Sequence, residues 1–60
     1  MKQAIEYRLD RFDGYDESPG ARPGGLVAYL NEIGKERWIL IESNSVRGRE
    51  QYLFYRVNEW

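Results

Sequence analysis

Arginine stands near glycine in two short stretches, and each stretch contains groups that bind anions. In ARPGGL, Arg22 comes before Gly24 and Gly25, which directly precede a segment of helical periodicity. The unpaired backbone N–H groups at a helix start attract phosphate or carboxylate. In SVRGRE, Arg47 and Arg49 flank a glycine, and two guanidinium groups can clamp a phosphate or an acidic partner. These five residues are the candidate anion-binding or ligand-binding set, although ordinary helix starts and charged turns have the same composition.

The acidic stretch DRFDGYDES is a second candidate for chemistry. It holds Asp10, Asp13, Asp16 and Glu17, and clustered carboxylates can bind calcium or act as a general acid–base pair. Their spacing differs from the D-x-D-x-D-G pattern of an EF-hand loop. We therefore expect a solvated acidic loop with no metal ion.

Cysteine and histidine are both absent from the chain. Their absence excludes a disulfide framework, the usual zinc, haem and iron–sulfur ligand sets, and catalysis by Cys–His or Ser–His pairs. An enzyme would have to work with carboxylates, tyrosine and lysine alone, in a chain with little room for a closed pocket. We predict a non-enzymatic protein that needs no cofactor.

The composition describes one small folded domain that is close to neutral. The chain has 60 residues, a formal charge of −1, and 42% hydrophobic and 32% charged residues, so a single domain over residues 1–60 is expected. Nucleic-acid binding needs a surplus of Lys and Arg that this chain lacks. No apolar run approaches the roughly 20 residues of a membrane span, and MKQAIEYRLD has no signal-peptide core. We expect a cytoplasmic protein; a virus-encoded protein working in a host cytoplasm has the same features.

The spacing of apolar residues predicts three strands and one helix. Residues 3–11 alternate as a strand does, and a long loop rich in glycine and proline follows them. LVAYLNEIGKER changes to a helical period, with Leu26, Leu30 and Ile33 on one stripe and Tyr29 beside it. WILIES and QYLFYRV are the second and third strands, joined by a turn within SNSVRGRE.

The element order is therefore β-α-β-β, which favours an α+β fold. The last two strands form a hairpin, and the third strand is the most apolar, so it suits the middle of the sheet. We predict a three-stranded antiparallel sheet in the order 1-3-2 with the helix on one face.

Both faces of the predicted hairpin are apolar, whereas one helix covers only one face. With the turn centred on Val46–Arg47, Tyr52 faces Ile41 and Phe54 faces Ile39, and these four residues form a bare face. The other face then packs toward the helix and holds Leu40, Leu53, Trp38 and Tyr55 together with Ile5, Tyr7, Leu9 and Val57. A register shifted by one residue gives two other apolar sets: Trp38, Leu40, Tyr52 and Phe54 on one face, and Ile39, Ile41, Leu53 and Tyr55 on the other.

A bare apolar face needs a cover in so short a chain. We predict a homodimer, or a higher symmetric oligomer, packed sheet to sheet through Ile39, Ile41, Tyr52 and Phe54. One alternative is that the long loop folds back over the face, with Phe12 and Tyr15 as its lid. Association through edge strands is another, and it leaves the bare face unexplained.

Arg8 and Arg56 are expected near Tyr52 and Phe54 on the bare face of the sheet. Arginine interleaved with aromatic residues is typical of platforms that stack single-stranded nucleic acid. The near-neutral charge and the intervening isoleucines favour a protein interface instead.

The segment LNEIGKERWILIE resembles a signature of the form L-N-x-x-G-x-x-G-W-x-L. That signature belongs to a family of very short bacterial and phage proteins of unknown function. The matching residues are Leu30, Asn31, Gly34, Trp38 and Leu40. Arg37 stands where the family usually has glycine. The resemblance implies a β-α-β-β fold and supplies no activity and no catalytic residues.

The residues and the resemblance lead to two functional hypotheses. The first is a non-enzymatic, oligomeric protein-interaction domain of adaptor or inhibitor type, bacterial or phage-encoded. Its long loop and hairpin tip are the expected contact elements. The alternative is a small-ligand binder that sequesters a nucleotide or another phosphorylated signal through the arginines and glycines named above.

Overall fold

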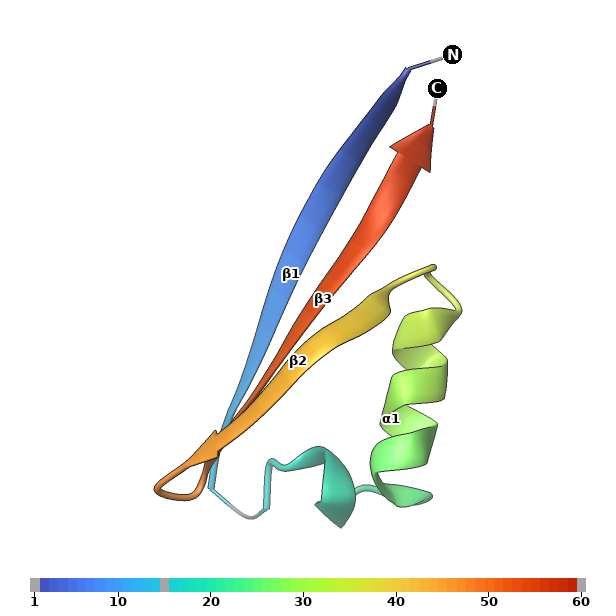
Figure 1. Ribbon diagram of the computed structural model, residues 1–60. Helices are drawn as coiled ribbons and strands as arrows, with labels where there is room; N and C mark the ends of the chain where they lie inside the picture. The colour runs from blue at the N-terminus through green and yellow to red at the C-terminus, as the bar shows by residue number, and fades with distance from the viewer. Residues whose placement is uncertain (1, 15, 60) are drawn as a thin grey trace.

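Three strands, one α-helix and a short 3-10 helix make up the fold (Figure 1). The computed structural model describes residues 2–14 and 16–59. The strands are β1 (Gln3–Asp13), β2 (Ile39–Val46) and β3 (Arg49–Glu59). The helix is α1 (Gly25–Gly34), and η1 (Pro19–Ala21) lies in the loop after β1. Within these residues, no helix is long and apolar enough to cross a bilayer.

Strand β3 is the centre of an antiparallel sheet with the order β1-β3-β2. It pairs with β1 over the full length of both strands, from Gln3 opposite Glu59 to Asp13 opposite Arg49. On its other side it pairs with β2, up to Tyr55 opposite Ile39. Helix α1 covers one face of the sheet (Figure 1). The predicted α+β fold with strand order 1-3-2 is confirmed.

A two-residue turn joins β2 to β3. Val46 pairs directly with Arg49, so Arg47 and Gly48 form the turn. Their φ angles are 52° and 78°, the positive values of the type I′ turns whose twist suits a two-residue hairpin. The turn therefore lies one residue further along the chain than the predicted centre at Val46–Arg47.

A β-bulge in β2 shifts the register again. Leu40 pairs with Phe54 and Glu42 pairs with Leu53, which leaves Ile41 as the extra residue. A bulge sets two residues of one strand opposite one residue of its partner. Beyond the bulge, the pairing groups the side chains as the shifted register does.

The core is built from two residues of α1 and two of β3. Tyr29 and Ile33 pack against Tyr52 and Phe54, which are only 8% and 1% exposed. The ring centroids of Tyr52 and Phe54 lie 5.8 and 6.2 Å from that of Tyr29. The prediction that Tyr52 and Phe54 lie on the bare face is therefore wrong. Helix α1 packs on the face of β3 that carries both rings, and the bulge in β2 brings Leu40 beside Phe54 on that face.

The described part of the long loop also packs on the helix side. Pro19 is fully buried, and the ring of Phe12 lies 5.4 Å from that of Tyr29, against the core. Phe12 is thus a core residue and not a lid over the other face. Tyr15, the second residue of the predicted lid, lies outside the described residues.

The molecule is elongated for its length. Its Cα radius of gyration is 13.0 Å, against about 10 Å for a compact domain of this size. Its accessible surface of 4791 Å² exceeds the about 4,100 Å² expected of a folded chain of this mass. The cause is visible in Figure 1: the terminal parts of β1 and β3 extend beyond α1 and β2 as a two-stranded ribbon.

Candidate functional site

A continuous group of apolar side chains lies on the face of the sheet opposite α1, with Val46 further along β2 beside Arg49. On β1 and β3, the pairs 5 with 57, 7 with 55 and 9 with 53 put one row of side chains on this face, and β2 extends the row beside Tyr55. We call this surface the open face. It consists of Ile5, Tyr7, Leu9, Ile39, Ile41, Leu53, Tyr55 and Val57.

Five members of the open face are exposed to an unusual degree for large apolar residues. The exposed fractions of Ile5, Tyr7, Leu9, Ile39 and Ile41 range from 46% to 67%. A large side chain has an accessible area of roughly 200 Å². These five side chains together therefore expose on the order of 500 Å² of apolar area to solvent. The largest apolar patch of a typical monomer is about 300–600 Å² and is often functional. The open face is therefore the main candidate binding surface of the protomer.

The open face contains two of the four predicted interface residues. Ile39 and Ile41 are 51% and 48% exposed there, whereas Tyr52 and Phe54 lie in the core. Ile5, Tyr7 and Leu9 take their place, and these were missed because they were expected beneath the helix. The Arg-Gly dipeptide at 47–48 marks a type I′ turn, but a turn moved by one residue shifts each pairing partner by two and leaves the side chains on the same faces. It therefore gave no signal for the face that the helix covers.

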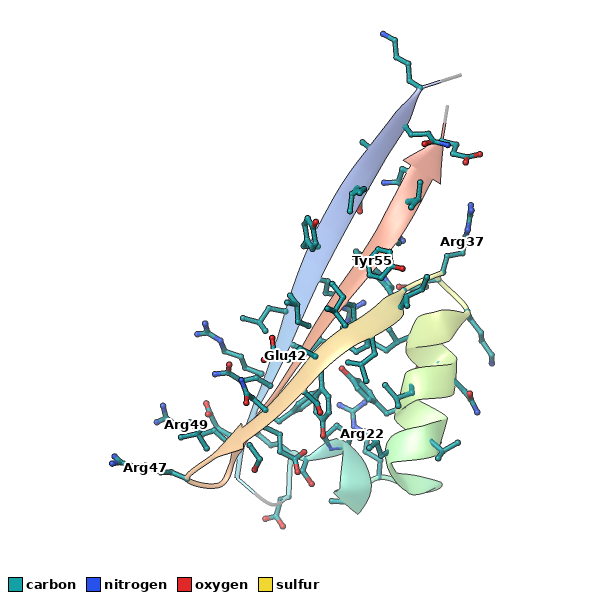
Figure 2. All side chains as sticks on the ribbon, viewed as in Figure 1. Arg22, Arg37, Glu42, Arg47, Arg49 and Tyr55 are labelled. Carbon is teal, nitrogen blue, oxygen red and sulfur yellow. The ribbon has the colours of Figure 1, made fainter. Side chains whose placement is uncertain are left out.

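The predicted anion-binding residues fall at two separate places. Arg22 lies between the sheet and α1, and Arg47 and Arg49 lie at the hairpin tip (Figure 2). Gly24 is the N-cap of α1 and Gly25 is its first residue, with φ angles of 84° and 67°. These glycines serve the sharp entry into the helix, which other residues adopt only with strain.

Both groups of arginines also have partners within the chain. The Arg22 guanidinium lies 5.4 Å from the ring centroid of Phe12 and 5.3 Å from that of Tyr29, where cation–π attraction favours it. Arg49 Nε lies 3.3 Å from Asp13 Oδ1. The five candidates therefore do not converge on one ligand.

A polar hollow of about 450 Å³ opens between β1 and α1 beside Arg22. Within it, Asp10 accepts hydrogen bonds from Tyr29 Oη at 2.5 Å and from Arg8 Nε at 2.8 Å. Arg8 Nη1 also lies 3.6 Å from a carboxylate oxygen of Glu36. The hollow is thus lined by charges that already neutralise one another.

The ionisation of these groups indicates a structural network and not a reactive one. Burial raises the pKa of Tyr29 above its ordinary value, and its hydrogen bond to Asp10 raises it further. The hydrogen bond to Asp10 raises the pKa of Arg8. Both shifts favour the protonated forms, so neither group serves as a base near neutral pH. In residues 2–14 and 16–59, no three acidic side chains gather to hold a metal ion.

Trp38 packs against the core on the helix side, at the end of β2 away from the hairpin turn. The guanidinium carbons of Arg56 and Arg8 lie 4.3 and 5.8 Å from its ring centroid. Arg56 Nη1 also donates to the carbonyl oxygen of Glu36 at 3.1 Å, and Arg56 Nη2 pairs with Glu6 at 3.1 Å. These arginines lie beside the core aromatics on the helix side and not on the bare face where they were expected, and there they cover Trp38.

Comparison of the chain with protein-family models, with curated proteins and with solved structures finds no match. The functional argument therefore depends on the geometry of the chain itself.

Proposed function

We propose that this chain is a non-enzymatic protein-interaction domain, of adaptor or inhibitor type, that acts as an oligomer, with a homodimer favoured. The observation that supports this is the open face, a continuous apolar surface that no element of the described chain covers. A protein partner suits it better than a nucleic acid because its rows are apolar and the charge beside them is the carboxylate of Glu42, opposite Leu53, which repels phosphate.

The area of the open face is large enough to hold two chains together. Covering on the order of 500 Å² on each copy yields about 25 kcal/mol at about 25 cal/mol per Å². Association costs about 4–15 kcal/mol in lost freedom. A chain of this length buries only about 60% of its unfolded surface and is marginal alone, so the gain also stabilises the fold.

An oligomer built through the open face leaves the long loop and the hairpin tip exposed. We propose these two elements as the contacts to a further protein partner, in the cytoplasm of a bacterium or of the host cell of a phage. The alternative function, binding of a nucleotide or another phosphorylated signal, requires Arg22 to act together with Arg47 and Arg49. These groups lie apart, and no observation favours that function.

The test is light scattering coupled to size exclusion over a concentration series. Tyr7 and Val27 are both 67% exposed, but Tyr7 lies on the open face and Val27 lies on α1. We expect Tyr7→Glu to abolish the oligomer, because it would bury two carboxylates at the interface. Val27→Glu is the matched control and should keep the wild-type mass.

Far-UV circular dichroism shows whether the Tyr7→Glu chain stays folded as a monomer or unfolds, and either result agrees with the proposal. A wild-type chain that stays monomeric at every concentration would contradict it. So would a Tyr7→Glu variant with the wild-type mass.

A further inference from the structure

The two ends of the open face carry opposite charges. Arg11 pairs with Gln51 and Asp13 pairs with Arg49 near the hairpin tip, and both pairs share the face of Tyr7. At the terminal end, Glu59 lies opposite Gln3 and accepts its side-chain hydrogen bond at 3.0 Å. The apolar residues of the open face lie between these ends.

The hairpin end is basic even after its internal ion pair and the carboxylate of Glu42, opposite Leu53 on the same face, are considered. Arg49 is neutralised by Asp13 at 3.3 Å. Within the described part of the chain, neither Arg11 nor Arg47 takes part in an ion pair. Arg47 lies at the hairpin tip, far from the termini (Figure 2). The terminal end of the same face is acidic through Glu59.

A second copy can pack on the open face in two aligned, symmetric ways. Stacked sheets keep their strands within about 30° of one another, and a two-fold axis makes both copies use the same surface. If the axis runs along the strands, each end of the face lies against the equivalent end of the second copy, so groups of like charge meet. If the axis runs across the strands, the basic end of each copy meets the acidic end of the other.

We propose that the open face binds a second copy of this chain face to face, with the strands of the two sheets antiparallel, so that Glu59 of each copy lies close to Arg11 of the other. This inference rests on the proposed function and names the partner and its orientation. The row of Tyr7 and Tyr55 lies midway between the two ends and therefore sits at the two-fold axis.

The same arrangement matches the apolar rows of the two copies. Ile5 and Val57 of one copy lie over Leu9 and Leu53 of the other. Each copy contributes on the order of 500 Å² of apolar surface, and the total reaches the about 1,000 Å² that a specific interface needs.

The antiparallel orientation also gives the protruding ribbon a cover. Beyond Ile39 the sheet has only two strands, β1 and β3, and a two-stranded ribbon is marginal in water by itself. In the antiparallel dimer this ribbon lies over the three-stranded hairpin end of the second copy. In the parallel dimer it would meet only another ribbon.

The test is a charge-swap cycle on Arg11 and Glu59, read as the dimer dissociation constant by sedimentation or light scattering. Arg11→Glu sets two carboxylates together at both symmetric contacts, and Glu59→Arg sets two guanidinium groups together. We expect each single variant to weaken the dimer about tenfold. The double variant, and an equimolar mixture of the two single variants, should recover an affinity within about threefold of wild type.

The recovery of affinity in the double variant cannot come from a contact between the two substituted residues of one chain. Arg11 and Glu59 are separated along the sheet by eight residues of extended strand, about 27 Å. Lys35→Glu and Glu17→Arg, exposed and outside the open face, make the same charge changes and should leave the constant unchanged. Single variants without effect, or a double variant as weak as the two losses combined, would overturn the antiparallel orientation. The proposed function would survive that result as long as Tyr7→Glu still abolishes the oligomer.

Discussion

Asp10 is the residue through which the helix is fixed to the edge strand. It lies on β1, and it accepts hydrogen bonds from Tyr29 on α1 and from Arg8 two residues away. A carboxylate that accepts a charged donor and a buried phenol makes strong hydrogen bonds. No local pattern predicts this contact, because 19 residues separate Asp10 from Tyr29 and only the seating of the helix brings them together.

Tyr29→Phe tests this contact through the pH dependence of stability. Burial raises the pKa of Tyr29 above its ordinary value of about 10. The stabilisation by the neutral phenol is therefore complete below pH 10 and is lost as the pH rises through the raised pKa of the folded state. We expect Tyr29→Phe to lower the free energy of unfolding by about 1.5–3 kcal/mol near neutral pH, and to lose less stability than wild type in alkaline solution.

Chemical denaturation at neutral and at alkaline pH measures both effects. Tyr29→Phe should keep part of the alkaline loss, because burial also raises the pKa of Tyr52. If the variant and the wild type lost stability equally with rising pH, Tyr29 would not be the titrating group.

At the scale of elements, the link between α1 and β2 contains a strained residue. Arg37 has a φ angle of 72°, a left-handed conformation that costs a residue other than glycine about 1–2 kcal/mol. Its N–H group donates to the carbonyl oxygen of Gly34 at 2.9 Å, which fixes the turn before Trp38.

Arg37→Gly should therefore stabilise the protein. The relief of strain exceeds the about 0.5–1 kcal/mol of extra chain entropy that glycine loses on folding, so we expect a net gain of about 0.5–1 kcal/mol in the free energy of unfolding. Urea denaturation measures it. Arg37→Ala removes the same side chain and keeps the strain, so it should give no such gain. Equal effects of the two substitutions would assign the change to the lost side chain.

The elements and their order could be predicted from the sequence, whereas the face each strand presents could not. Alternation in β1, the period of α1 and the apolar β3 were sufficient for the fold. The error lay in which face of β3 the helix covers. The displaced turn shifts each pairing partner by two residues and leaves the faces unchanged, whereas the bulge at Ile41 exchanges the faces of β2 beyond it and has no signal of its own. Hydrophobicity could not correct the error, because both faces of β3 are apolar.

At the scale of the whole molecule, the described chain forms two layers, a sheet and a helix on one of its faces. Within the described residues, the other face of the sheet has no layer packed against it. Domains bury the faces of their sheets between layers, and here the second layer covers only the side of Tyr52 and Phe54. The open face and the protruding ribbon both lack a cover within the described chain. Association supplies this missing layer, so we expect folding and assembly to be coupled.

This coupling predicts a melting temperature that depends on protein concentration. Mass action adds about 2.7 kcal/mol of stability to a dimer for about a hundredfold rise in concentration. For two chains of this length, that corresponds to an increase of about 10 °C. Thermal unfolding followed by circular dichroism measures it. Val27→Glu should keep the dependence, because its side chain lies outside the open face, and Tyr7→Glu should abolish it. A wild-type melting temperature that does not change with concentration would mean that the protomer is stable with its apolar face in water.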